Sequence, residues 1–214
     1  MKTNKIVAGL AALVIGFAAF LLWRQFSKPA INLRPSNAVG EVLAGEVLRM
    51  LGPTGKVVLI GRSVSRDGGD ASSEQITSLQ AALKSRAAAS IIATEWLPRA
   101  PVGTMDLGGI APGKFMELLD KNKDAGAFVV FAGLPPFSQE LAAKLTARSL
   151  KLLAVCGYNA HVRHWLEARA LSVAVVPRSE ELSAEASAPK TTADWFEREF
   201  QMVTPENVGR LATP

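Results

Sequence analysis

Side chains that can stack on or hydrogen-bond a small polar molecule follow the predicted strands of this 214-residue chain. They include an indole and a phenol with faces for stacking, an amide for paired hydrogen bonds, three guanidinium groups and one hydroxyl. The candidate ligand-binding residues are Arg62, Ser63, Trp96, Arg99, Tyr158, Asn159 and Arg178. An alternative interpretation is that arginine and asparagine occupy these positions because exposed loops favour polar residues.

Ser63 is a candidate nucleophile, but its surroundings argue against an enzyme. The segment 61–65 follows a predicted strand, as the G-x-S-x-G elbow of serine hydrolases does, yet it ends in Ser where the elbow requires Gly. Neither His161 nor His164 has a clear orienting carboxylate. A serine hydrolase using Ser63 therefore stays a remote alternative, and we predict no catalytic residues and no enzyme activity.

Metal and cofactor binding are not expected either. His161, His164 and Glu167 would share one face of a helix, but no further ligand set accompanies them, which favours a solvated helix surface. Cys156 is the single cysteine, and this excludes a disulfide framework and a multi-cysteine zinc site. The loop 61–73 lacks both glycine-rich nucleotide motifs, and its two aspartates would repel phosphate. We predict no metal and no cofactor.

An alternation of strands and helices would place the candidate residues along one edge. From residue 36 onward, short apolar runs alternate with amphipathic stretches, a pattern typical of a parallel sheet covered on both faces. The expected strands span residues 56–61, 90–96, 127–132, 151–156 and 171–176. We predict an α/β fold with a single doubly wound, flavodoxin-like, parallel five-stranded sheet in the order 2-1-3-4-5 and helices on both faces. Ligands of such sheets bind at the carboxyl ends of the strands, where the candidates lie.

The first residues of the chain read as a membrane anchor. Ile6–Trp23 is an unbroken apolar run of eighteen residues between lysines and an arginine. As a helix it would span roughly 27 Å, close to the hydrocarbon thickness of a bilayer, so we predict a transmembrane helix. A cleaved signal peptide ending at Gly16-Phe17-Ala18 is the alternative. The flanking charges do not choose between the two orientations.

The basic character of the chain is confined to this anchor. The net charge is +5, but residues 1–28 hold four basic residues and no acid, which leaves 20 basic and 19 acidic residues elsewhere. Nucleic-acid binding needs clustered positive charge, so we expect none. The expected divisions are an anchor at 1–28 with its helix at 6–23, a linker at 29–35, an α/β lobe at 36–208 with a flexible loop at 179–192, and a tail at 209–214.

Several segments resemble type I periplasmic binding proteins, the family of sugar-binding proteins and of the effector domains of lac-repressor-like regulators. Residues 37–48 and 55–60 resemble the family's G-x-x-A helix and the GKVxxI strand that follows it. Residues 128–135 (Phe-Val-Val-Phe-Ala-Gly-Leu-Pro) resemble the third strand of a lobe. The segments 153–159 and 165–176 resemble a strand ending in a ligand-gripping residue and the helix and strand after it; the tail 200–207 is similar to the "VTxEN" ending of several sugar-binding members.

The resemblance implies a setting and a ligand class. It covers one lobe, the C-terminal one, and the membrane segment stands where the other lobe would be. Asn159 takes the place of the common ligand-gripping Asp. The implied protein is a single-pass protein of the cytoplasmic membrane, with its N-terminus inside and a periplasmic or extracellular domain that binds or senses a sugar-like polar solute. A transport partner or a second copy would complete the cleft; the alternative is a degenerate lobe that serves as an interaction or scaffold module of an envelope or transport complex.

Overall fold

The computed structural model describes residues 16–18, 32–63, 71–86, 89–98, 109–157, 162–178 and 188–211. The chain divides into two units, Met1–Asn32 and Leu33–Pro214, and the second contains the α/β domain. The predicted membrane helix at 6–23 lies outside the described residues, except for 16–18, which are helical. Within the ranges that the structure describes, no helix combines the length and apolar character needed to cross a membrane.

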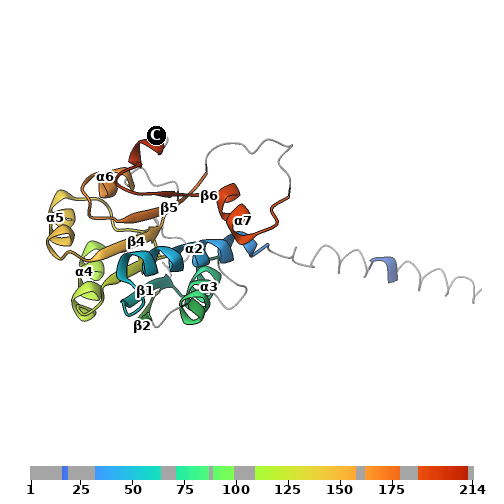
Figure 1. Ribbon diagram of the computed structural model, residues 1–214, viewed down its shortest axis with the longest axis horizontal. Helices are drawn as coiled ribbons and strands as arrows, with labels where there is room; N and C mark the ends of the chain where they lie inside the picture. Colours follow the sequence, from blue (N-terminus) through green and yellow to red (C-terminus); the bar gives the residue numbers. More distant parts are fainter. Residues whose placement is uncertain are drawn as a thin grey trace, which may run out of the picture. The chain divides into compact units, whose positions relative to one another are not determined.

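The domain is built on a six-stranded mixed sheet with the order β2-β1-β3-β4-β5-β6 (Figure 1). The first five strands pair in parallel, in the predicted order 2-1-3-4-5. The sixth pairs antiparallel with β5, from Ala174↔Val203 to Pro177↔Phe200. The strands are β1 Lys56–Arg62, β2 Ser90–Leu97, β3 Ala127–Val130, β4 Lys151–Val155, β5 Val173–Pro177 and β6 Phe200–Val203.

The prediction of five strands, all parallel, was therefore wrong by one strand. Phe200–Val203 is four residues long and has a single β-branched residue, at its end, so it carries little strand signal of its own. It becomes a strand because the preceding helix returns the chain to the open edge of β5, where its backbone groups find hydrogen-bond partners. The edge of β5 exists only in the assembled sheet, so no local sequence pattern predicts that β6 pairs with it.

Helices cover both faces of the sheet (Figure 1). Those on one face pack against Val57 and Leu59 of β1, and those on the other pack against Val58 and Ile60. The first group is α2 Arg34–Leu51, α3 Ala71–Arg86 and α7 Thr192–Glu199; the second is α4 Pro112–Lys121, α5 Gln139–Ala147 and α6 Val162–Glu167, with a 3₁₀ turn η1 at Val208–Arg210.

Burial on both faces explains why the strands read as continuous apolar runs. All four residues of β3 are buried, and successive side chains enter opposite core clusters. Phe128 joins the cluster under α4, α5 and α6, which also holds the fully buried Phe115 and Trp165. Val129 joins the cluster under α2, α3 and α7. The core thus has two halves separated by the sheet.

Two helices begin at side-chain caps. The hydroxyl of Ser138 accepts a hydrogen bond from the N–H of Leu141 and caps α5. Thr191 and Asp194 form a reciprocal capping box on α7. Backbone N–H donors from Thr191 and Lys190 hold the pKa of Asp194 below its usual value. α7 begins at Thr192, the last residue of the predicted flexible loop 179–192; residues 179–187 of that loop lie outside the described residues.

Candidate functional site

The candidate site lies at the carboxyl ends of the parallel strands, where the chain direction across the sheet reverses. After β1 the chain crosses to β2 on one side, and after β3 it continues to β4 on the other. The two ends are held together, because the N–H of Phe131 donates to the carbonyl of Ile60 at 2.8 Å. In doubly wound sheets this reversal leaves a crevice beyond the strands, which makes it the default position for a ligand.

The side chain of Arg62 links three chain segments through hydrogen bonds at this reversal of strand order. Its Nε donates to the carbonyl of Ala132 at 3.2 Å, and its Nη2 donates to the carbonyl of Gly109 at 3.2 Å. Gly109 in turn approaches the backbone of Leu134 so closely that a Cβ there would lie 2.4 Å from the carbonyl oxygen. From the end of β1, the predicted ligand-binding arginine therefore braces the loops that follow β2 and β3.

Trp96 lies close to Arg62 in the sheet but on the other face. Its indole covers Gly61, where an added Cβ would meet the ring at 2.8 Å and Ile76 of α3 at 2.6 Å. The side chain of Trp96 is nevertheless 45% exposed. Ser63 is also exposed, and its backbone N–H donates to the carbonyl of Leu97 at 2.8 Å. The end of the β1–β2 pair thus carries two exposed residues, Trp96 and Ser63.

Arg178 lies at the other side of the same edge, after β5. Its backbone N–H donates to the carbonyl of Glu199, and its side-chain Nε donates to the carbonyl of Phe200, each at 3.0 Å. Four strand spacings, roughly 19 Å, separate β2 from β5, so Arg178 and Trp96 do not face one small ligand together. The remaining predicted site residues, Arg99, Tyr158 and Asn159, lie outside the described residues.

Glu95, one residue before Trp96, has a structural partner set. Its carboxylate accepts hydrogen bonds from Lys121 Nζ at 2.8 Å and from Asn122 Nδ2 at 3.3 Å, the last residue of α4 and its C-cap. The hydrogen bond from Lys121 is the main reason why the pKa of Glu95 lies below its usual value. This carboxylate fastens the edge strand β2 to the helix that covers it.

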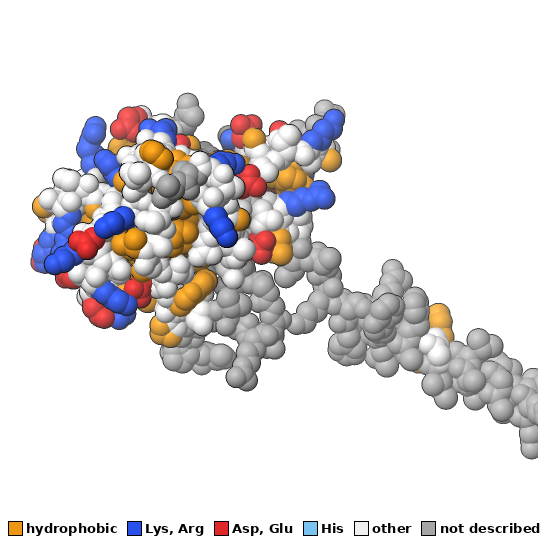
Figure 2. Space-filling view, turned by 60° about the horizontal axis from the view of Figure 1, so that its bottom comes forward, with side chains coloured by type: hydrophobic (Ala, Val, Ile, Leu, Met, Phe, Trp, Pro, Cys, Tyr) orange, Lys and Arg blue, Asp and Glu red, His pale blue; other side chains and the backbone are white. Residues whose placement is uncertain are grey.

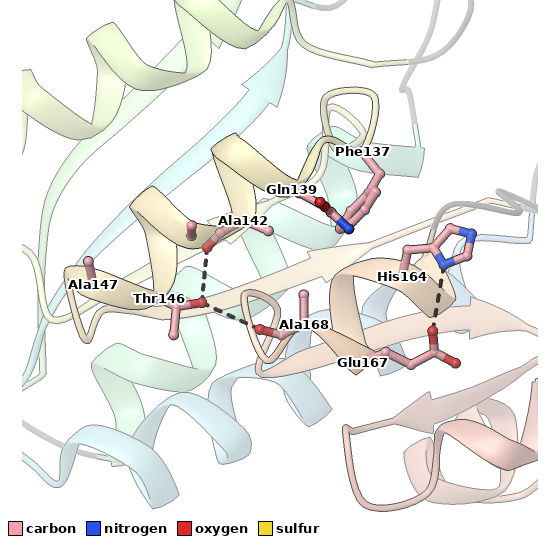
Figure 3. Close-up of a pocket in the computed structure, with 9 residues that line it drawn as sticks. Phe137, Gln139, Ala142, Thr146, Ala147, His164, Glu167 and Ala168 are labelled. Atoms are coloured by element: carbon pink, nitrogen blue, oxygen red, sulfur yellow. Dashed lines mark hydrogen bonds and ion pairs between the residues drawn. The ribbon is translucent and has the colours of Figure 1, made fainter.

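A groove between α5 and α6 was not anticipated from the sequence (Figure 3). It has a volume of about 670 Å³ and a floor of alanines and one threonine. Thr146 Oγ1 donates to the carbonyl of Ala142 at 2.9 Å and lies 3.4 Å from that of Ala168. Its lining residues are Phe137, Gln139, Ala142, Ala143, Thr146, Ala147, His164, Glu167 and Ala168. The run of small residues within 139–147 is the signal that could have indicated it.

The titratable side chains of this groove, His164 and Glu167, are exposed and lie close to each other within α6. His164 Nδ1 lies 3.6 Å from a carboxylate oxygen of Glu167, and both side chains are about half exposed. Phe137 packs on His164 and on Trp165, with ring centroids 5.4 and 5.2 Å apart. Among the described residues no group of three metal-ligating side chains forms, and His161 lies outside them. The sheet order also separates His164, beyond β4, from Ser63 at β1.

Charge at the surface of the domain is mixed in sign. Figure 2 shows lysine and arginine side chains interspersed with aspartate and glutamate over the visible face. Many are close pairs, such as Arg148 with Asp120 at 2.6 Å and Lys144 with Glu140 at 2.6 Å. Such intermixing is typical of a solvated face rather than of a phosphate-binding stripe.

No family model and no curated protein sequence matches the chain. Solved structures do match its fold, and three of them illustrate the range. An arabinose-binding protein from Geobacillus stearothermophilus is 14% identical with a TM-score of 0.56, covering 83% of this chain and 63% of its own. A sugar-binding protein of a sugar ABC transporter from Bacillus halodurans is 14% identical with a TM-score of 0.55, covering 81% and 63%. A putative LacI transcriptional regulator from Bacteroides fragilis is 10% identical with a TM-score of 0.54, covering 83% and 62%.

These likenesses concern the fold. Identities of 10% to 14% carry no information on individual ligand contacts. The chain spans just under two thirds of the length of each of these structures. The mixed sheet with helices on both faces is therefore similar in fold to part of these sugar-binding proteins and of the putative LacI regulator.

Proposed function

We propose that the protein is a membrane-anchored solute-binding or sensing domain for a sugar-like polar molecule, held on the extracytoplasmic side of the membrane. The observation that carries the proposal is the half-exposed indole of Trp96 at the carboxyl end of β2, beside the reversal of strand order. Sugars present faces of C–H groups that stack on an indole, while their hydroxyls need donors and acceptors at its rim. Ser63 supplies one such group.

The fold likeness to sugar-binding proteins supports the ligand class, and the apolar run at 6–23 supports the anchor. We place the N-terminus inside and the domain in the periplasm or outside the cell, and equate the domain with the C-terminal lobe of a type I binding protein. One lobe leaves half of a bound sugar in water, whereas small-molecule sites bury most of their ligand. A second copy or a transport subunit is the proposed other wall of the cleft.

In this proposal the candidate residues divide by role. Trp96 stacks on the ligand, and Ser63 hydrogen-bonds it. Arg62 acts through the backbone, because it fixes the segments at Gly109 and Ala132 that flank the crevice. Arg99, Tyr158 and Asn159 follow the ends of β2 and β4, where they would add stacking and hydrogen bonds.

A calorimetric titration of the full chain in detergent micelles with a panel of pentoses and hexoses tests the proposal. We expect one class of sugar to bind, and Trp96→Ala to weaken that binding by about tenfold or more, as loss of a stacking face costs roughly 1–3 kcal/mol. Ile92→Ala is the matched control, since Ile92 is an apolar side chain of the same strand with 41% exposure. Absence of heat with every sugar, or equal weakening by both variants, would contradict a ligand site at Trp96.

A scaffold module is the second candidate function, and one observation favours it. Both arginines that the structure describes at this edge, Arg62 and Arg178, donate to backbone carbonyls of their own domain. An edge built mainly for its own fold would suit protein contacts better than solute capture. In that case cross-linking in native membranes would trap a partner, and a Ser63→Arg change at the exposed end of β1 would abolish the cross-link while sugars remain without effect.

A further inference from the structure

The outer side of β2 has no described strand beside it (Figure 1). β2 is the longest of the six strands, and among the described residues it pairs with β1 alone. Natural sheets protect such an edge with lysine, proline or a bulge. β2 contains neither lysine nor proline, and its one charged side chain, Glu95, is paired with Lys121. Its bulge lies at Ile92, which has no partner on β1, and residues 93–97 pair regularly. The carboxyl half of the edge is therefore open to pairing.

Backbone groups of Thr94 and Trp96 point out of the sheet at this edge. The carbonyl of Leu97 accepts the N–H of Ser63 at 2.8 Å, so the backbone of Leu97 faces β1. Successive residues of a strand direct these groups to opposite sides, which turns those of Trp96 and Thr94 outward. Among the described residues, none forms a backbone hydrogen bond with these outward groups. Such groups are a template for another strand.

The exposed apolar side chains of the domain lie on the same strand. Within the described part of residues 33–211, Ile92 and Trp96 are the only large apolar side chains that are exposed. Thr94 stands midway between them. When two copies pair antiparallel about a two-fold axis at Thr94, Ile92 of each copy therefore comes opposite Trp96 of the other. Cross-strand pairs of an aromatic and a β-branched side chain are favourable.

Charge also favours this register. Ala93 of each copy comes opposite Glu95 of the other, so no like charges oppose each other within the two strands. A shift of the axis by one residue would set Glu95 against Glu95, which is destabilising. The edge is thus complementary to itself about Thr94, as a contact between two copies of one chain requires.

The edge is large enough for a stable dimer. Its eight residues measure roughly 26 Å in length. The sheet and one helix layer on each face are together roughly 30 Å thick. Both neighbouring helices contact β2, α3 through Gln80 and Thr94 and α4 through Lys121 and Glu95. The resulting area of about 800 Å² for each copy is the usual size of a specific interface.

We propose that two copies of this chain pair antiparallel through β2, with a two-fold axis at Thr94, and join their sheets into one. The inference goes beyond the proposed function, because the edge can pair whether or not a ligand binds. It also names a second copy as the partner at the candidate site. In that role, which rests on the proposed function, Ile92 of the second copy forms a wall beside Trp96.

Mass measurement of the full chain in detergent micelles tests the pairing. Light scattering after size exclusion should give a dimer for the native chain, with dissociation on dilution. Thr94→Lys sets two like charges across the axis, so we expect it to raise the dissociation constant of the dimer about tenfold or more. Thr146→Lys is the matched control, because it makes the same change at an exposed position of α5, and it should leave the dissociation constant unchanged.

Cross-linking locates the axis and does not depend on how well the lysine variant folds. Residues that form a hydrogen-bonded antiparallel pair have Cα atoms about 5.5 Å apart, a separation that a disulfide can span. Thr94→Cys should therefore give a disulfide-linked dimer under mild oxidation, resolved on a non-reducing gel, and Thr146→Cys should not. Native Cys156 is buried and does not compete.

A native chain that stays monomeric at every concentration would overturn the proposal. So would a dimer that Thr94→Lys leaves intact, or equal cross-linking at residues 94 and 146, because the contact would then lie elsewhere. The sugar titration gives an independent answer. Sugar binding by a monomeric chain would contradict the pairing and leave the proposed function in place, whereas a dimer that binds no sugar would contradict only the proposed function.

Discussion

Two regions of the domain carry aromatic and polar side chains at the surface, and they are held in opposite ways. At the carboxyl edge, Arg62 donates to backbone carbonyls 47 and 70 residues away in the chain. In the α5–α6 groove, His164 faces Glu167 three residues along its own helix. The arginine of the edge is thus held by tertiary contacts, whereas the His164–Glu167 pair of the groove is local to one helix and exposed to solvent. Geometry at the edge depends on the whole fold, and a site can be pre-organised there more readily than in the groove.

Removal of the Arg62 guanidinium should produce the largest difference between the two regions. Arg62→Met keeps the aliphatic stem but deprives the carbonyls of Gly109 and Ala132 of a charged donor. Hydrogen bonds to charged groups contribute about 1.5–3 kcal/mol, so we expect a loss of about 2 kcal/mol in the free energy of unfolding. Urea denaturation followed by far-UV circular dichroism measures it.

His164→Gln is the matched change in the groove. His164 Nδ1 lies 3.6 Å from the Glu167 carboxylate at an exposed position, and even fully charged exposed pairs contribute only about 0–1 kcal/mol. A shift near zero is expected in the same urea experiment. Comparable losses for Arg62→Met and His164→Gln would break the comparison, because the groove would then be as structural as the edge.

Crowding at Gly61 gives the next largest effect. A Cβ there would lie 2.6 Å from Ile76 and 2.8 Å from Trp96, so Gly61→Ala must displace both side chains. Overpacking of this kind costs about 1–3 kcal/mol. We expect the double variant with Trp96→Ala to recover part of the loss, which the urea midpoints of the two single variants and the double variant would reveal. Additive losses would mean that the indole does not rest on Gly61.

The smallest effect concerns pH and the attachment of β2 to α4. The pKa of Glu95 is lowered, mainly by the hydrogen bond from Lys121, from an ordinary value of 4.5. A depressed folded-state pKa contributes stability above the ordinary value and loses it as the pH falls through the folded value. As the pH is lowered below 4.5, the urea concentration at the unfolding midpoint should therefore decrease slightly. It should decrease less in Glu95→Gln over the same pH range. If the urea midpoints of the native protein and of Glu95→Gln changed equally with pH, the Glu95 carboxylate would not be the group that stabilises the attachment of β2 to α4.

Much of the architecture was predictable, for physical reasons that particular segments illustrate. The apolar runs at β1, β3, β4 and β5 are buried on both faces, so their composition alone marks them as central parallel strands. Ser138 caps α5 through the N–H of Leu141, a contact within one turn that local sequence can specify. β6 escaped prediction, since its pairing partner is the edge of β5 rather than anything in its own sequence.

The candidate site divides in the same manner. Sequence reasoning placed Arg62, Ser63 and Trp96 at strand ends, and the structure brings them to the end of one strand pair. It did not predict that the side chains of Arg62 and Trp96 turn to opposite faces, or that Arg178 stands about four strand spacings from Trp96. Side-chain direction follows from register, and register is set by the assembled sheet.

By itself, the sequence determined the alternation of buried strands and amphipathic helices, the order of the first five strands and the confinement of excess positive charge to residues 1–28. These are consequences of local composition and of the handedness of crossover connections. The tertiary structure alone decided the sixth strand, the bracing of the edge by Arg62 and the groove between α5 and α6. Each of these joins backbone or side-chain groups that are distant in the chain, and such contacts are defined only once the sheet has assembled.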